Sequence, residues 1–409
     1  MLATIAWRNL WRHARRSLIT AVAMAIGLAM CMVTVCFQDG MFEDLFSVMV
    51  EQQLGHVQVH HPDYPSSRVL FDVLEDAEAL MADVEAVPGT LAVAPRVYGF
   101  ALVGGEERTA GGLLQGISPS RERLVTPLSE RVVEGRYLAD EPSGEALLGE
   151  RLAETLDIEV GQSILTVTQS ADGSMGNELF TVVGLVRTGN VQLDRSGAVL
   201  HVADLQRLLV LEGRVHGLTL LADSEADLAR YAEAVREQIG QEEVEVLAWW
   251  EASPQTAEIM AMRDAGAAIL LGIVFAVAAF GILNTMMMSV FERTVELGVI
   301  KALGMRPRDM IWLILLESVM LAAVASVIGL VLGGLGDAWL MHRGFDLSGA
   351  AEDGFSFAGV MIEPVVYGSV RPAPIAFMVL ALFAVTLLSS LWPAIRASRL
   401  QPVESIRSE

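Results

Sequence analysis

Residues 291–306, FERTVELGVIKALGMR, decide the fold of this chain because they form a short charged segment between two long apolar stretches. Their pattern predicts a short amphipathic helix, which Gly304 ends and which Pro307 keeps from continuing. A charged segment of this length between two membrane-spanning stretches has to lie at a membrane surface. The chain around it is therefore expected to cross a membrane more than once.

The composition supports a membrane protein. The 409 residues are 53% hydrophobic and 19% charged, which is too apolar for an ordinary soluble enzyme. A membrane-spanning helix needs about 20 apolar residues, and four stretches reach that length. The first of them follows a basic start, but its apolar run exceeds that of a cleaved signal peptide, so we interpret it as an uncleaved anchor. The predicted spans are residues 17–38, 265–291, 310–336 and 372–394.

Basic residues predict the orientation of these spans. They gather in the amphipathic N-terminal segment 1–16, in the loop 292–309 and in the tail 395–409. Because cytoplasmic loops carry the excess of positive charge, all three segments are predicted to lie in the cytoplasm. Residues 39–264 then lie on the other side, with 15 arginines against 39 acidic residues. The formal net charge of −22 for the whole chain argues against a nucleic-acid partner.

The external segment is predicted to form a small α+β domain that is split by a β-rich insertion. Residues 104–215, the insertion, contain short alternating strands such as 163–167 and 179–186, with a hairpin turn at 171–174. The expected fold class is therefore an α+β membrane protein with four transmembrane helices and a large external domain between the first two. The two β-α-β units of that domain are predicted at 56–60, 71–87 and 91–103, and at 217–222, 224–239 and 244–249.

Two polar residues lie inside the predicted spans. Glu317 is the one ionisable residue within the third span, and Asn284 lies at a similar depth in the second. Ionisable groups inside a membrane are usually paired or functional. The sequence leaves open whether these two residues form structural hydrogen bonds or take part in a conformational change.

Several segments resemble the FtsX/MacB/LolC-LolE superfamily of ABC transporter permeases. Residues 292–310, ERTVELGVIKALGMRPRDM, are similar to the superfamily's loop signature, and residues 392–407 are similar to its closing motif. Residues 6–20, AWRNLWRHARRSLIT, resemble its N-terminus. The resemblance thus covers the whole chain. The shorter segments GHVQVHHPDY, APRV and LLQGISP, at 55–64, 94–97 and 113–119, are similar to the LolC/LolE lipoprotein-release branch.

The resemblance implies a permease subunit in the inner membrane of a bacterium, with its large domain in the periplasm. It also implies a second permease chain, identical or homologous, and a separate cytoplasmic ATPase dimer. ATP and Mg²⁺ would then be held by that ATPase, and this chain would bind no cofactor. The sequence agrees, because it contains no G-x-x-x-x-G-K-[ST] phosphate-binding motif.

By the same resemblance, the loop after the second span is a coupling element that docks on the ATPase. The alternative is an ordinary charged loop that obeys the positive-inside rule. The residues assigned to the coupling element are Glu292, Arg293, Glu296, Gly298, Lys301, Ala302 and Gly304.

Apolar residues continue beyond the first two spans as predicted stalks. A helix over residues 254–291 would be about 57 Å long, against about 30 Å for the hydrocarbon core. Apolar surface outside the lipid has to be covered by the other stalk, by the external domain or by an acyl chain of a substrate. The candidate access path for a lipid-bearing substrate consists of Met41, Phe42, Leu45, Phe46, Met260 and Ile269.

Three functions fit this sequence. The first is the extraction or translocation of lipoproteins or other lipophilic substrates, and the large split domain and apolar stalks favour it. The second is FtsX-like transmission of motion to a cell-wall hydrolase, without transport. The third is MacB-like efflux with a periplasmic adaptor. An enzyme is not expected, since no nucleophile–base or metal pattern occurs.

Two further expectations concern the histidines and the last external loop. His56 and His60 share one face of a predicted strand but lie about 13 Å apart, so they and His61 are not expected to bind a metal. The loop 337–371 is interpreted either as an ordered external flap or as a surface loop.

Overall fold

The computed structural model describes residues 2–12, 14–224, 227–240, 244–347, 355–357, 359–362 and 364–399. The chain divides into two compact units, each with its own hydrophobic core. The first unit comprises Met1–Phe42, Met262–Leu347 and Val365–Glu409. The second comprises Glu43–Ala261 and Ser348–Pro364. The end of the predicted closing motif, from residue 400 onward, lies outside the described residues.

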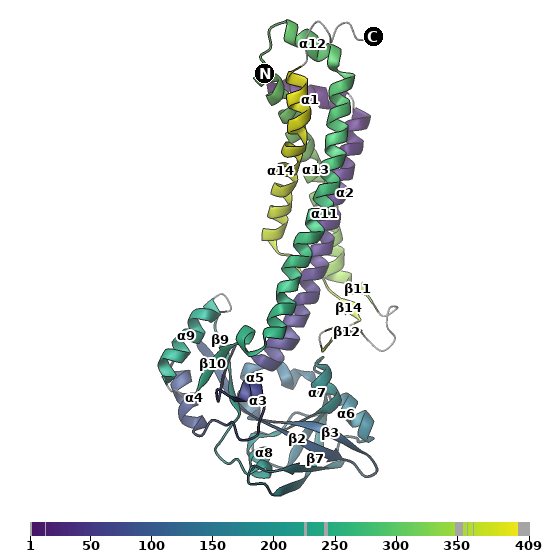
Figure 1. The fold of residues 1–409 in the computed structure, drawn as a ribbon. Coiled ribbons are helices and arrows are strands. Elements are labelled where there is room, and N and C mark those ends of the chain that lie inside the picture. Colours follow the sequence, from purple (N-terminus) through teal and green to yellow (C-terminus); the bar gives the residue numbers. More distant parts are fainter. Residues whose placement is uncertain are drawn as a thin grey trace. The chain divides into compact units, whose positions relative to one another are not determined.

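Long apolar helices run side by side in the first unit (Figure 1). Among the described residues, four helices are long and apolar enough to cross a membrane, which confirms the predicted number of spans. Each helix extends beyond its predicted apolar span. The four long helices are α2 (Ala14–Phe46), α11 (Pro254–Glu292), α13 (Pro307–Arg343) and α14 (Pro372–Ser398). Two shorter helices accompany them, α1 (Leu2–Arg12) and α12 (Thr294–Ala302).

Glycines let α13 approach α2 closely. A Cβ atom added to Gly329 would lie 2.9 Å from a methyl group of Leu28, and one added to Gly333 would lie 2.6 Å from the sulfur of Met32. Small residues at such spacing allow helix backbones to pack tightly inside a membrane, where no hydrophobic effect drives them together. α2 and α13 therefore pack closely against each other at these two glycines.

The segment predicted as the loop 337–371 begins as helix, because α13 continues to Arg343. After it, β11 (Phe345–Asp346) pairs with β14 (Val365–Val366), and β12 (Phe355–Phe357) pairs with β13 (Val360–Ile362). The described parts of this segment are thus ordered by short hairpins. Residues 348–354, which include two of its glycines, lie outside the described residues.

The second unit contains the split α+β fold that the sequence predicts. β1 (Val57–His60), β9 (Gly217–Ala222), β10 (Glu245–Ala248) and β2 (Thr90–Gly104) form the antiparallel order β10-β1-β9-β2. The two strands of each predicted β-α-β unit are therefore separated by a strand of the other unit, as in split β-α-β folds. The connecting helices are α4 (Ala77–Glu85) and α9 (Leu228–Ile239).

Both connecting helices are shorter than predicted. α4 begins at Ala77 and not at residue 71, because Leu74 forms a β-bridge with Val215 and the Asp76 side chain accepts a hydrogen bond from the backbone of Ala79. An aspartate in this capping position marks a helix start. α9 ends at Gly240, as predicted, with a φ angle of 56°. Residues 225 and 226, in its predicted first turn, lie outside the described residues.

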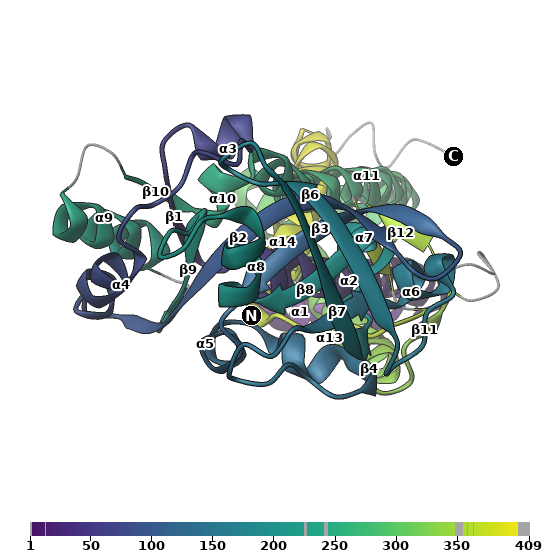
Figure 2. The ribbon, with the colours of Figure 1, turned by 90° about the horizontal axis from the view of Figure 1, so that it is seen from below.

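The insertion closes into a small barrel that shares β2 with the split unit (Figure 2). Among the described residues, the pairing runs β2-β3-β8-β5-β7-β6 and returns to β2. The predicted hairpin is present, since Gln169 pairs with Met175 across the turn. The remaining strands are β3 (Thr109–Ile117), β4 (Val132–Gly135), β5 (Glu145–Gly149), β6 (Ser163–Gln169), β7 (Met175–Val186) and β8 (Gly197–His201).

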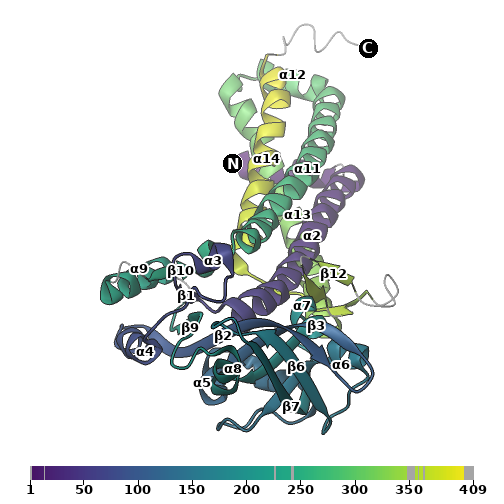
Figure 3. The same ribbon diagram turned by 60° about the horizontal axis from the view of Figure 1, so that its bottom comes forward.

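Alternation along the barrel strands builds its core. Val103, Leu114, Ile164 and Phe180 are fully buried, whereas Leu165 and Leu179 on the same strands are exposed. Short helices, several of which are labelled in Figure 3, surround the strands. They are α3 (Tyr64–Ser67), α5 (Pro119–Val125), the 3₁₀ helix η2 (Pro127–Arg131), α6 (Glu150–Leu156), α7 (Val191–Ser196), α8 (Val202–Leu209) and α10 (Trp249–Ala252); the π-helix η1 (Ser47–Leu54) follows α2.

Candidate functional site

The loop predicted as a coupling element forms the helix α12. The helix ends at Ala302, and Gly304 follows two residues later with a φ angle of 102°, a conformation that residues with a side chain rarely adopt. Its C-terminal end is tied to another helix, because the Lys301 ammonium donates a hydrogen bond to the carbonyl oxygen of Ser398, the last residue of α14, at 2.8 Å. A lysine at this position also balances the partial negative charge at the end of α14.

Arg293, the residue before α12, turns inward and meets Glu317 of α13. Its Nη1 donates to both carboxylate oxygens, at 3.1 and 3.2 Å, and both side chains are 10% exposed. Asn9 of α1 donates to the same carboxylate at 2.7 Å. Glu317 is therefore a buried, paired charge that holds three separate helices together, and the cost of burying it is offset by these contacts.

Two further ion pairs, both with Glu296, close the network. Arg293 Nε contacts Glu296 at 3.5 Å, and the other oxygen of Glu296 lies 3.0 Å from the guanidinium of Arg12 at the end of α1. The polar contacts thus run from Asn9 through Glu317, Arg293 and Glu296 to Arg12. A displacement of α12 has to move α1 and α13 or break this network.

The two faces of α12 differ. Leu297 is buried against Val290 and Met310, whereas an apolar ridge faces away from the bundle. We define this ridge as Val295, Val299 and Leu303, which recur every four residues and are 47%, 44% and 84% exposed. An exposed apolar helix face of this kind is a feature of protein–protein contact sites. Glu292, Ala302 and Gly304 are exposed too, and Gly298 is buried.

The structure separates the two polar residues predicted inside the spans. Glu317 is buried in the network, whereas Asn284 is exposed on α11. The contacts of Asn9 and Arg12 were not predicted from the sequence, in which Arg12 served only as one of the basic residues that indicate the orientation. Both residues lie in AWRNLWRHARRSLIT, the N-terminal segment that resembles the superfamily, and the three-residue spacing of Asn9 and Arg12 on one helix face is the signal that would have indicated a shared contact.

The predicted access path is mostly covered within the chain. Phe42 and Leu45 are buried, and Phe46 packs edge-on against Trp249 with ring centres 5.5 Å apart. Met41 and Met260 are half-buried, and Ile269 is 65% exposed. The six residues therefore do not form one open apolar surface in this conformation.

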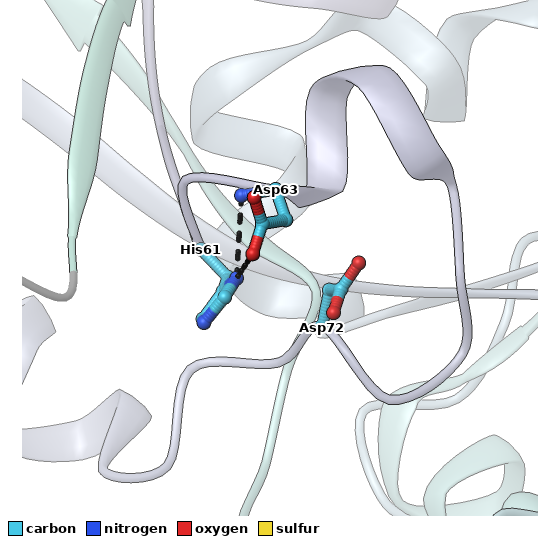
Figure 4. Close-up of side chains that lie close together, drawn as sticks. All are labelled: His61, Asp63 and Asp72. Atoms are coloured by element: carbon cyan, nitrogen blue, oxygen red, sulfur yellow. Dashed lines mark hydrogen bonds and ion pairs between the residues drawn. The ribbon is translucent and has the colours of Figure 1, made fainter.

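The three histidines considered as metal ligands have different surroundings. His56 Nδ1 accepts a hydrogen bond from the backbone of Ala222, and His60 is buried. His61 lies beside Asp63 and Asp72, and one potential ligand atom from each of these three lies within 4.8 Å of the others (Figure 4). His61 Nδ1 accepts a hydrogen bond from the backbone N–H of Asp63 at 3.3 Å, so it stabilises the turn before α3. The absence of a metal site stays a prediction.

A buried ion pair connects β2 to α5 in the second unit. Arg96 of β2 donates to Glu122 at 2.7 and 3.3 Å, and both side chains are 1% exposed. Burial opposes the charge on Arg96, but Glu122 outweighs it and raises the pKa of Arg96 above its usual value. Arg96 also donates to the Gln53 carbonyl of η1, so this pair fixes the π-helix to β2.

Comparisons with known proteins identify the family of this chain. Residues 268–402, which contain α12, match the family described as FtsX-like permease C-terminal, and residues 17–238 match the MacB-like periplasmic core domain. Because the second match covers more than half of the chain, the chain belongs to the FtsX/MacB-type ABC transporter permeases. Members of this family are permease subunits, which require an ATPase and often a second permease.

Individual relatives span several branches. The lipoprotein-releasing system transmembrane protein LolC of Neisseria meningitidis serogroup B is 26% identical over 96% of this chain and 94% of its own length. An uncharacterised ABC transporter permease of Methanocaldococcus jannaschii, MJ1507, is 24% identical over 100% and 98%. Among solved structures, the periplasmic region of MacB from Actinobacillus actinomycetemcomitans is 13% identical with a TM-score of 0.37, covering 50% of this chain and 94% of that one.

Proposed function

We propose that this chain couples ATP hydrolysis by a separate cytoplasmic ATPase dimer to motions of its external domain that extract or translocate a lipoprotein or another lipophilic substrate. The ATPase holds ATP and Mg²⁺, and a second permease chain completes the transporter. The proposed location is the inner membrane of a bacterium, with the second unit in the periplasm. The likeness to LolC over nearly the whole chain supports this choice of substrate.

The proposal rests on one observation: the short helix α12 has an exposed apolar ridge and, with the residue before it, is also part of a buried polar network. Val295, Val299 and Leu303 offer a surface to a partner, while Arg293 and Glu296 connect the same helix to α1 and α13. A force applied to the ridge therefore reaches two other helices directly. An ordinary solvent-exposed loop would have neither the apolar ridge nor the buried charge pair.

The burial of Phe42 and Leu45 favours a second candidate, FtsX-like transmission of motion without transport. In this conformation Phe42 and Leu45 are covered within the chain, so an acyl chain reaches these two residues only after a rearrangement. Lipoprotein release requires a state in which these residues become accessible. Mechanical transmission does not.

Photo-crosslinking distinguishes the two candidates. A photoreactive residue in place of Phe42 is compared with one in place of Ile269, which is already exposed. For lipoprotein release, Phe42 crosslinks to a lipid-modified protein in the nucleotide-free transporter and loses that crosslink when ATP binds. Crosslinks from Phe42 only to the permease partner, in every nucleotide state, would contradict release and favour mechanical transmission.

A further inference from the structure

The second unit contains a cavity of about 480 Å³ beside β2, at the point where one edge of this strand changes its partner from β9 to β6. β2 pairs with β9 as far as Arg96 and with β6 from Leu102 onward, both on one edge, while β3 pairs with its opposite edge. Among the residues that the structure describes, no strand pairs with β2 on the first edge over residues 97–101. This gap in the sheet borders the cavity, which Tyr98, Gly99 and Phe100 help to line.

Two side chains take the place of a strand along part of the gap. The backbone N–H of Tyr98 donates to His216 Nδ1 at 3.0 Å, and Thr168 donates to the carbonyl oxygen of Phe100 at 2.7 Å. Backbone groups of alternate residues face the same edge of a strand. The carbonyl of Tyr98 and the N–H of Phe100 therefore face the gap with no strand beside them.

The walls of the cavity combine apolar side chains with polar side chains that are nearly all uncharged. A carboxamide has both a donor and an acceptor. Gln58 and Asn190 already use both of theirs within the chain. The charged lining residues are Arg68 and Glu122, and Glu122 is already occupied by Arg96 and by Thr126 at 2.8 Å. This contrasts with the surplus of acidic residues in the external segment as a whole. The carboxamide residues are Gln52, Gln53, Gln58, Gln115, Gln169, Asn190 and Gln192.

Aromatic and aliphatic side chains form the apolar part of the wall. The Tyr64 ring packs against His60 and His216, with ring centres 5.4 and 5.0 Å apart. Phe71 and Phe100 are 63% and 66% exposed at the cavity. Rings of this kind provide contact area for apolar groups of a ligand with little loss of side-chain entropy.

We propose that this cavity binds a short, extended segment of uncharged polypeptide. Peptide groups alternate donors and acceptors, so they match both the carboxamides and the open edge of β2, as in strand addition. Apolar side chains of the segment lie against the aromatic rings. A fatty acyl chain would offer no hydrogen bond to the open edge of β2 or to the carboxamides of Gln115, Gln169 and Gln192, and desolvating these groups costs free energy.

Isothermal titration of the full-length chain in detergent tests this proposal. The probe is the blocked pentapeptide acetyl-Ala-Ser-Val-Asn-Ala-amide, with the β-1,4-linked dimer of N-acetylglucosamine and decanoate as competitors. The peptide is expected to bind saturably, and neither competitor is expected to displace it. The assay needs neither ATP nor an ATPase, so its result is independent of the proposed coupling.

Two variants locate the binding. Gln115→Ala, on the floor of the cavity, and Phe100→Ala, at its exposed rim, are each expected to weaken peptide binding about fivefold or more. Leu179→Ala is the matched control, because Leu179 is 64% exposed on β7 and does not line the cavity. Equal melting temperatures show that the variants are folded. Absence of saturable peptide binding, displacement by either competitor, or unchanged affinity in both variants would overturn the proposal.

Discussion

Arg293 and Glu317 form the central charge pair of the first unit, with Nη1 of Arg293 at 3.1 and 3.2 Å from the two carboxylate oxygens. The two residues lie on either side of α12, one just before it and the other in α13. Both are largely removed from water, so their attraction is screened little by solvent. The pair therefore ties the position of α12 to that of a membrane helix.

Removal of the charge on Glu317 is expected to destabilise the bundle. Glu317→Gln keeps the shape of the side chain but leaves Arg293 buried without an anion, which costs about 3–5 kcal/mol. The double variant Glu317→Gln/Arg293→Met should recover part of that loss, because neither charge remains. Thermal unfolding in detergent measures the effect, with Asn284→Ala as an exposed control. A decrease in unfolding temperature for Glu317→Gln that is no larger than for the control would show that the pair contributes nothing to the stability of the bundle.

Gly304→Val is expected to uncouple ATP hydrolysis from function while the protein still inserts into the membrane. Valine is strained at a φ angle of 102°, so the end of α12 has to shift. Gly272→Val is the matched control, because it adds the same side chain to a helical glycine with open space around it. The ratio of ATP hydrolysed to substrate released is the measurement. Equal ratios for the two variants would contradict a coupling role for this turn.

Cysteine labelling tests the predicted orientation. Ser174 is exposed on the turn between β6 and β7, and the native Cys31 and Cys36 are buried, so a cysteine in place of Ser174 supplies the reactive thiol. Ser170, the residue before the predicted turn, is buried and hydrogen-bonded to Leu208, so it is a poor position for the label. A membrane-impermeant reagent should label Ser174→Cys from the periplasmic side of intact cells. Labelling only after the reagent is given access to the cytoplasm would indicate the opposite topology.

His216 is expected to remain neutral well below pH 6. Burial lowers the pKa of His216 to about 4, and its Nδ1 already accepts the N–H of Tyr98. The unfolded chain binds a proton near pH 6.5 and the folded chain does not, so folding stability falls as the pH drops from about 6.5 to about 4. From pH 7 to pH 5 this amounts to about 2 kcal/mol.

Histidine NMR of the full-length chain measures this directly, with His216→Gln to assign the signal. The imidazole of His216 should show no protonation at pH 5, and the wild type should lose more stability than His216→Gln between pH 7 and pH 5. A His216 signal that titrates near pH 6.5 would contradict the assigned hydrogen bond.

Much of the architecture follows from local sequence patterns. Apolar length predicts the four spans, and alternation with a turn at 171–174 predicts the β6–β7 hairpin. The closure of the insertion into a barrel was not predictable, because it depends on the pairing of Leu102 with Val167, residues 65 positions apart. The late start of the predicted helix 71–87 had a similar cause, since Leu74 pairs with the distant Val215.

The candidate site was predictable only in part. The sequence indicated α12 and the turn at Gly304 that follows it, and it identified Glu317 as the charge inside a span. It did not indicate that Arg293 faces inward to meet Glu317, because a charged residue in a loop is usually solvated. Asn9 lies 308 positions from Glu317, so no local pattern connects them.

The most direct test of the account is the ATPase activity of the reconstituted transporter with a charge placed on the exposed ridge. The chain alone should hydrolyse no ATP, because its sequence lacks a phosphate-binding loop. With its ATPase subunit and second permease, the wild type should release substrate in proportion to ATP hydrolysed.

Leu303→Asp, at the most exposed position of the ridge, should abolish release and prevent recovery of the ATPase with the permease, whereas Leu179→Asp on the second unit should not. Normal release and normal ATPase recovery with Leu303→Asp would contradict the claim that α12 couples this permease to its ATPase.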